Sequence, residues 1–179
     1  MGDHHEYSAR FEACLTADVY RAAWRYAWQL CRVAEDAEDL LQEALAQAWL
    51  SFPQLRDPAR FKGWLLRIVR TRFLMHRRRR AIETADSDPA IRAGTEGRYP
   101  AADRNLGLPP ELAAAVHGLA PALREVVELF YLHELSGAEI GEVLSIRPAA
   151  VKVRLHRARR ALSRALAPEG RLADVKRSK

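Results

Sequence analysis

The residues with chemical potential in this sequence are charged side chains gathered into three separate segments. Residues 32–43 carry five carboxylates and one arginine, whereas residues 56–80 carry ten arginines and lysines and one aspartate. Residues 147–164 carry seven basic side chains and no acid. Clustered lysine and arginine bind polyanions such as the nucleic-acid backbone, and a carboxylate patch binds a partner of opposite charge. The pattern therefore predicts two polyanion contacts and one contact with a different partner.

The same residues do not assemble into a catalytic or metal site. Carboxylates can act as general acids or bind metals, but no histidine, lysine or nucleophile accompanies those between residues 35 and 43. Cys14 and Cys31 lie seventeen residues apart without CxxC spacing, and His4 and His5 stand in a polar leader. We therefore expect no enzyme activity, no metal, no cofactor and no cysteine-based redox sensor.

Composition agrees with a folded protein rather than a disordered or membrane-spanning one. The chain is 49% hydrophobic and 29% charged, with a net charge of +6. Its apolar runs are too short for a bilayer, and its first fifteen residues show no basic segment followed by an apolar core. We expect a cytoplasmic protein.

Helices position the first two charged segments. A stripe of apolar residues from Phe11 to Leu30, spaced by three or four, predicts a helix over about 10–32. A second helix carries the acidic residues, and Pro53 ends it. We expect Asp36 to cap this helix and the side chain of Asp39, three residues later, to reach back to the cap. A third begins at Asp57-Pro58 and runs into the basic tract HRRRR.

Aromatic residues lie in the third helix or just before it. Stacking of single-stranded bases needs aromatic faces beside cations. For Phe61 and Trp64 we favour a place in the core instead. The basic face is the better candidate for binding DNA. The aromatic residues of this segment are Phe52, Phe61, Trp64 and Phe73.

Apolar periodicity is lost after the basic tract and returns near residue 108. The intervening stretch is rich in Gly, Pro, Asp, Ser and Thr, which is typical of a linker. We predict an all-α protein with two small helical domains, 1–80 and 108–167, a flexible linker over 81–107 and a basic tail over 168–179.

The second domain contains a helix-turn-helix signature. Ser136 and Glu139 have capping-box spacing, Ser145-Ile146-Arg147 forms a short turn, and Pro148 opens a further helix. The start of that last helix is the part that enters the major groove in such motifs. The candidate DNA-binding residues are Arg147, Ala149, Ala150, Lys152, Val153, Arg154, His156, Arg157 and Arg160.

Two long motifs carry a resemblance to a known family. DAEDLLQEALAQAW followed by FKGWLLRIVRTRFLMHRRRR resembles region 2 of bacterial sigma-70 family RNA polymerase sigma factors. LAPALREVVELFYLHELSGAEIGEVLSIRPAAVKVRLHRARRAL resembles region 4. The motifs stand in the family's order, and a linker replaces region 3, as in the extracytoplasmic-function (group IV) members.

The resemblance implies a promoter-specific transcription initiation factor that recognises the −10 and −35 elements. Its partners would be core RNA polymerase (the β′ clamp helices and the β subunit), promoter DNA and an anti-sigma factor. Core polymerase would be bound by Asp36, Glu38, Asp39, Gln42 and Glu43. The −10 element would be bound by Arg56, Arg60, Lys62, Arg67, Arg70, Arg72, His76, Arg77 and Arg78, and the −35 element by the helix-turn-helix residues given above.

Three positions depart from the family's pattern. Thr71 and Met75 stand where members often have asparagine and aspartate, and Ser145 stands where a glycine is common. Serine adopts a left-handed backbone less readily than glycine does.

The main alternative is a helix-turn-helix transcriptional regulator that acts on duplex DNA without core polymerase. It explains residues 136–164 equally well. It does not explain an acidic helix followed by a basic aromatic helix in the first domain, and an enzyme acting on nucleic acid lacks an acid–base or metal set.

Overall fold

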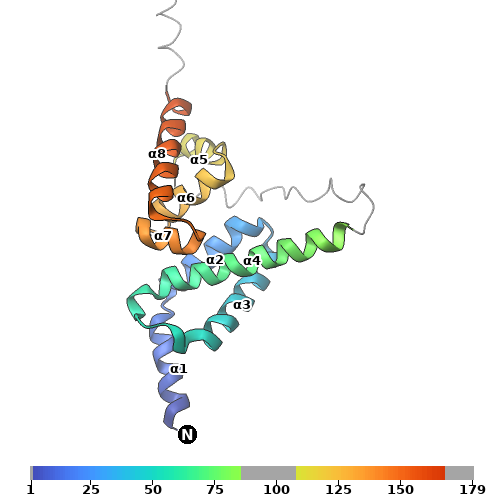
Figure 1. Cartoon of the computed structure of the whole chain (residues 1–179), viewed down its shortest axis with the longest axis vertical. Coiled ribbons are helices and arrows are strands. Elements are labelled where there is room, and N and C mark those ends of the chain that lie inside the picture. The colour runs from blue at the N-terminus through green and yellow to red at the C-terminus, as the bar shows by residue number, and fades with distance from the viewer. Residues whose placement is uncertain (1, 86–107, 168–179) are drawn as a thin grey trace, which may run out of the picture. The chain divides into compact units, whose positions relative to one another are not determined.

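The computed structural model of this chain describes residues 2–85 and 108–167, and every regular element in these residues is a helix (Figure 1). The helices fall into two compact units, α1 to α4 in the first and most of α5 to α8 in the second. The predicted all-α class is therefore confirmed. Residues 86–107 of the expected linker, and the expected tail, lie outside the described residues. Within the described ranges, no helix combines the length and the hydropathy needed to cross a membrane.

The first unit is a bundle in which α2 (Ala17–Cys31), α3 (Ala34–Ser51) and α4 (Phe61–Ala85) pack against one another. Figure 1 shows α4 running beside the other two helices. Burial of apolar surface drives this packing. The buried side chains include Ala23, Tyr26, Leu40, Leu41, Ala44, Leu65 and Val69.

The predicted helix over 10–32 is wrong, because the chain forms two helices there. Helix α1 spans Gly2–Cys14, and α2 begins at Ala17 after an extended Thr16. The Thr16 hydroxyl accepts a hydrogen bond from the backbone N–H of Val19 at 3.3 Å and so caps α2. The apolar spacing continues past Thr16, but the helix does not, because Thr16 caps a new one.

Aromatic residues of α1 pack against the end of α3 and the start of α4. Tyr7 and Phe11 contact Trp49 edge to face, with centroid distances of 4.7 and 5.1 Å. Phe11 also lies 5.2 Å from Phe52 and 5.5 Å from Phe61. Such ring pairs stabilise beyond the area they bury.

The borders of α3 and α4 differ in part from the prediction. Helix α3 begins at Ala34 with Val33 at its N-cap and no side-chain cap, so Asp36 lies in the first turn instead of capping. A carboxylate there interacts favourably with the helix dipole. Two 3-10 helices, η1 (Phe52–Gln54) and η2 (Pro58–Arg60), join α3 to α4.

The predicted start at Asp57-Pro58 agrees with the structure. The Asp57 carboxylate accepts a hydrogen bond from the backbone N–H of Ala59 at 3.0 Å, and Pro58 opens η2, which leads directly into α4. Helix α4 continues to Ala85, past the expected domain border at residue 80.

The second unit comprises α5 (Pro110–His117), α6 (Pro121–Tyr131), the first part of α7 (Gly137–Leu144) and α8 (Pro148–Ala165). Proline opens three of these helices, at a position where its missing N–H costs nothing. Helix α6 packs along α8. One apolar cluster of this unit includes Val116, Leu119, Val127 and Ala158, with Leu112, Leu123 and Leu162 at its edge.

The helix-turn-helix has the predicted cap and a tightly closed turn. The Glu139 carboxylate accepts from the backbone N–H of Ser136 at 2.8 Å, and the Ser136 hydroxyl accepts from the N–H of Glu139 at 3.3 Å. In the turn, the backbone N–H of Ile146 donates to the Gly141 carbonyl at 2.9 Å. A Cβ on Gly141 would lie only 2.8 Å from the Ile146 carbonyl oxygen, so the close approach needs a glycine or a shifted turn.

Ser145 occupies the turn in a left-handed conformation with φ of 55°. For a residue with a Cβ this costs roughly 1–2 kcal/mol. We expect Ser145→Gly to stabilise the helix-turn-helix by about 1 kcal/mol, since glycine removes this strain but gains freedom in the unfolded chain.

All four tryptophans lie in the first unit, so the measurement is amide hydrogen exchange of α7 and α8 rather than fluorescence. Ser145→Ala is the matched control because it keeps the Cβ and should not stabilise. Equal protection in the glycine and alanine variants would show that the left-handed backbone carries no cost.

Candidate functional site

The carboxylates of α3 divide into two sets. Asp36 and Glu43 face α4: Arg80 donates to both oxygens of Asp36 at 3.2 and 3.4 Å, and His76 Nε2 lies 2.8 Å from Glu43 Oε2. Such exposed pairs stabilise by at most about 1 kcal/mol each. They hold these two side chains against their neighbour and direct them away from a partner.

Glu38, Asp39 and Gln42 form the other set, which we call the outer acidic face. All three are exposed, and within residues 2–85 and 108–167 their side chains form no hydrogen bond or ion pair. The opposite side of α3 is buried through Ala37, Leu40, Leu41, Ala44 and Ala48. The packing of α3 therefore leaves a polar and negatively charged surface free to bind.

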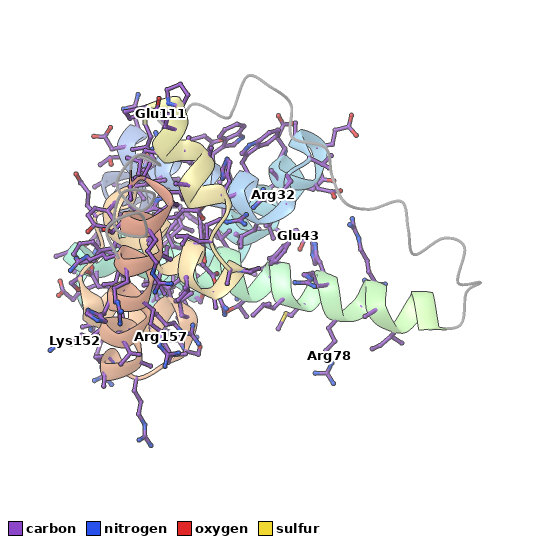
Figure 2. All side chains as sticks on the ribbon, turned by 90° about the horizontal axis from the view of Figure 1, so that it is seen from above. Arg32, Glu43, Arg78, Glu111, Lys152 and Arg157 are labelled. Atoms are coloured by element: carbon purple, nitrogen blue, oxygen red, sulfur yellow. The ribbon has the colours of Figure 1, made fainter. Side chains whose placement is uncertain are left out.

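The predicted DNA-binding residues around α4 also differ in their surroundings. Arg56, Arg60, Arg67, Arg77 and Arg78 are exposed, and Figure 2 shows Arg78 projecting from the helix. Lys62, Arg70, Arg72 and His76 are half-buried. Arg72 donates to the Gln47 side chain, and His76 bonds Glu43, so these two residues point toward α3.

A groove of about 430 Å³ opens between α3 and α4. It mixes apolar and charged side chains, and Leu50 and Met75 in it are 74% and 57% exposed. Its lining consists of Glu43, Ala46, Gln47, Leu50, Arg72, Met75, His76 and Arg79. Met75, one of the departures from the family's pattern, therefore lies beside α3. Thr71 also differs from the family's pattern, and its hydroxyl donates to the Arg67 carbonyl of its own helix at 2.8 Å.

The aromatic residues near the start of α4 belong mainly to the core. Phe52 and Phe61 are buried, and Trp64 is half-buried against Phe61. Phe73 is half-buried, with the Arg77 guanidinium 5.9 Å from its ring centroid. The favoured interpretation of Phe61 as a core residue is thus confirmed.

Helix α8 buries one side and exposes most of its candidate DNA-binding residues. Val151, Leu155 and Ala158 are buried. Arg147, Ala149, Lys152, Val153, His156, Arg157 and Arg160 are exposed, whereas Ala150 and Arg154 are half-buried. Figure 2 shows where Lys152 and Arg157 leave the helix.

Arg159 has a role that sequence reasoning missed. Its Nε donates to the Tyr131 hydroxyl at 3.0 Å, and its guanidinium lies 5.7 Å from the Phe130 ring centroid and 5.9 Å from that of Tyr131. This contact ties α8 to α6 through a cation–π interaction and a hydrogen bond. In the sequence, Arg159 cannot be distinguished from the other arginines of the basic segment. The adjacent aromatic residues Phe130 and Tyr131 are the one signal that could have indicated a cation–π partner.

The two cysteines are free thiols, and each is half-buried. Burial raises the pKa of the Cys31 thiol to about 11, the Asp36 carboxylate adds to the rise, and Arg80 opposes it. Among the described residues, no three histidine, cysteine or acidic side chains gather closely enough to hold a metal ion.

Family comparison resolves what these two units are. Residues 15–82 match the family model Sigma-70 region 2, and residues 110–162 match Sigma-70, region 4. The chain belongs to the sigma-70 family. It is an RNA polymerase sigma factor of the extracytoplasmic-function type, as the resemblance implied. The alternative, a regulator acting without core polymerase, is not favoured, because it accounts for region 4 alone.

Relatives and solved structures of sigma factors cover most of the chain. It is 38% identical to the ECF RNA polymerase sigma factor SigE of Mycolicibacterium smegmatis, over 80% of this chain but only 55% of SigE. It is 33% identical to SigL of Mycobacterium tuberculosis, over 87% of this chain and 90% of SigL. The sigma factor RpoE of Bartonella quintana, solved with the anti-sigma factor NepR, aligns with a TM-score of 0.66 and 26% identity, over 84% of this chain and 93% of RpoE.

The raised pKa of Cys31 predicts a poorly reactive thiol. The thiolate is the nucleophile, and a pKa near 11 leaves little of it at pH 8. In a Cys14→Ser variant we expect iodoacetamide to alkylate Cys31 about a hundredfold more slowly in the folded chain than after unfolding in urea, where a thiol pKa is about 8.5. Mass spectrometry measures the alkylation rate in the folded and in the unfolded chain. A Cys31→Ser variant gives the same two rates for Cys14 as a comparison. Similar rates before and after unfolding would contradict the prediction and reopen a redox role for Cys31.

Proposed function

We propose that this sigma factor binds core RNA polymerase through α3 and directs initiation by contacting the −10 element with α4 and the −35 element with α8. The supporting observation is that one acidic face on α3 and two basic faces on α4 and α8 lie on three separate helices, in a chain that matches both regions 2 and 4. Its role is that of a specificity subunit, with the chemistry of RNA synthesis left to the core enzyme. It would act in the cytoplasm, where the polymerase works.

The outer acidic face is the proposed docking surface for the core enzyme. Glu38, Asp39 and Gln42 stand on a helix whose other side is fixed in the bundle, so their backbone is already ordered before a partner binds. A basic partner surface, such as the β′ clamp helices, would complement them. Asp36 and Glu43, which also belong to the predicted set, contribute mainly by holding α3 against α4.

The −10 contact is proposed for the exposed arginines near the start of α4 and along its middle. Arg56, Arg67, Arg77 and Arg78 are available to phosphates, and Lys62 and Arg70 lie partly within the surface. Opening a duplex costs a few kcal/mol for each unstacked base, which cationic contacts must offset. Because Phe52 and Phe61 are buried, base stacking on those two rings has no part in the proposal.

Helix α8 is the proposed −35 reader. Its first turns carry Ala149, Lys152 and Val153, where a recognition helix meets base edges, and His156, Arg157 and Arg160 follow toward the phosphates. Arg147 stands at the N-cap, and Arg154 and Ala150 flank the exposed face.

An anti-sigma factor is a further proposed partner. Two similar structures, RpoE with NepR and CnrH with the cytosolic domain of CnrY, hold a sigma factor in a complex. An inhibitor that covers the outer acidic face or α8 would prevent the proposed contacts of this chain.

Reconstitution with core RNA polymerase tests the proposed function. The chain and core enzyme are mixed with a library of genomic promoters, and the transcripts are sequenced. A sigma factor gives defined start sites only when both proteins are present. Binding of duplex DNA by the chain alone, with no initiation in the mixture, would favour a regulator instead.

Charge reversal on the outer acidic face should weaken core binding. We expect Asp39→Arg to lower affinity for core polymerase at least about tenfold, because it places like charges opposite each other. Affinity is measured by fluorescence anisotropy of the labelled chain. Glu6→Arg on α1, another exposed carboxylate, is the matched control and should bind nearly as wild type. Asp39 would have no role in docking if both variants bound equally well and kept wild-type helicity.

Arg157 should contribute affinity without sequence discrimination. Loss of one phosphate contact lowers affinity for all promoters alike and reduces the slope of log K against log salt by about one. We therefore expect holoenzyme with Arg157→Ala to bind matched and mismatched −35 sites with the same ratio as wild type. Arg154→Ala is the comparison, because loss of a base contact would cost about 1–3 kcal/mol and relax discrimination. A changed base preference in Arg157→Ala would assign that side chain to a base.

A further inference from the structure

Val153 is an apolar side chain on the outer surface of a basic helix. It is 48% exposed, whereas Val151, Leu155 and Ala158 of the same helix are 0%, 7% and 0% exposed. At about 100° per residue, Val153 lies roughly 200° around the helix from Val151. It therefore points almost directly away from the core of its unit.

The surroundings of Val153 are cationic rather than apolar. Lys152, His156 and Arg157 are exposed around it, and Ala149, one turn earlier, is exposed and small. The other large exposed apolar residues described in the second unit are Tyr131, which bonds Arg159, and Leu166, which follows the end of α8. Protein-docking surfaces are contiguous apolar patches, and Val153 belongs to none.

A single apolar group within a cationic rim matches the major groove of DNA. There, the C5-methyl group of thymine is the apolar feature that distinguishes its base pair, and aliphatic or small side chains contact it. Lysine and arginine at the rim hold the phosphates on either side. The alanine at position 149 leaves room for a base edge to approach the helix.

We propose that Val153 reads the C5-methyl group of a thymine in the upstream promoter element. This rests on the proposed −35 role of α8 and adds the base class that one of its side chains recognises. Lys152 and Arg157 position the helix through phosphates, and Val153 supplies discrimination that charge alone does not give.

The test compares thymine with deoxyuridine, which lacks only the methyl group. Holoenzyme made from the full chain and core polymerase first selects promoters from a library randomised in both elements. Each thymine of the enriched upstream motif, on either strand, is then replaced by deoxyuridine in turn, and holoenzyme affinity is measured. At one position we expect a loss of about fourfold, the factor for withdrawing one methyl group from an apolar contact.

Two variants assign that loss to Val153. Val153→Ala should bind the thymine and deoxyuridine duplexes with equal affinity at that position. Since Val153 is exposed and alanine favours helices, the fold should be unaffected. Arg160→Ala, the control, should weaken both duplexes equally and keep the fourfold ratio.

The inference is overturned if the upstream motif contains no thymine, if no deoxyuridine substitution matters, or if Val153→Ala keeps the discrimination. A loss of core binding in Val153→Ala with an unchanged ratio would make Val153 a protein contact instead. Each of these results leaves promoter-directed initiation by wild-type holoenzyme intact. Failure to initiate at all would instead refute the proposed function.

Discussion

The burial of one side of α3 between α2 and α4 is the constraint on which the first unit depends. Its inner face is made of Ala37, Leu40, Leu41, Ala44 and Ala48, all of them buried. Alanine at three of these positions presents little bulk, so neighbouring helices can approach closely without leaving voids. Once this face is buried, the rotation of α3 is fixed. Which carboxylates meet α4 and which meet solvent then follows from the helical repeat.

That rotation decides how the acidic and basic helices share their charges. Asp36 and Glu43 fall on the edge nearest α4 and are paired with Arg80 and His76. The outer acidic face lies farther around α3 and keeps its charge exposed. Local pairing thus joins oppositely charged helices at one seam, while the remaining surfaces stay different in sign. A protein that binds both DNA and the core enzyme needs this separation, because fully neutralised helices would attract neither partner.

Sequence patterns predicted the elements well where a single signal dominated. The capping box at Ser136 and Glu139, the proline that opens α8, and the cap at Asp57 all appear where residue chemistry required them. Errors arose where two signals competed. The apolar stripe from Phe11 to Leu30 continues through Thr16, yet the Thr16 hydroxyl caps a new helix. Asp36 is a residue type that often caps helices, but α3 begins two residues before it, at Ala34.

At the candidate site, residue types could be predicted from the sequence, whereas the direction in which each side chain points depends on helix packing. Glu43 and Asp39 look alike in the sequence, as do Arg159 and Arg160, but one member of each pair is bound within its own unit. Such pairings join residues 28 or more positions apart, and periodicity within one helix carries no information about them. Contacts of this kind depend on how two helices cross, which is set by the shapes of buried side chains.

In the second unit, the contacts that orient α8 are distinct from the side chains proposed to recognise promoters. The Gly141 to Ile146 turn and the Arg159 contact with α6 fix the direction of α8. Exposed cations on α8 then attract any DNA, because every phosphate carries the same charge. If α8 reads the −35 element as proposed, promoter choice rests on the side chains near its start, and several of these are small or uncharged. Under that proposal, replacing Ala149 or Val153 during evolution would change the preferred promoter while leaving general DNA affinity nearly constant. Such a division lets a sigma factor acquire a new set of promoters without losing its hold on DNA or on the polymerase.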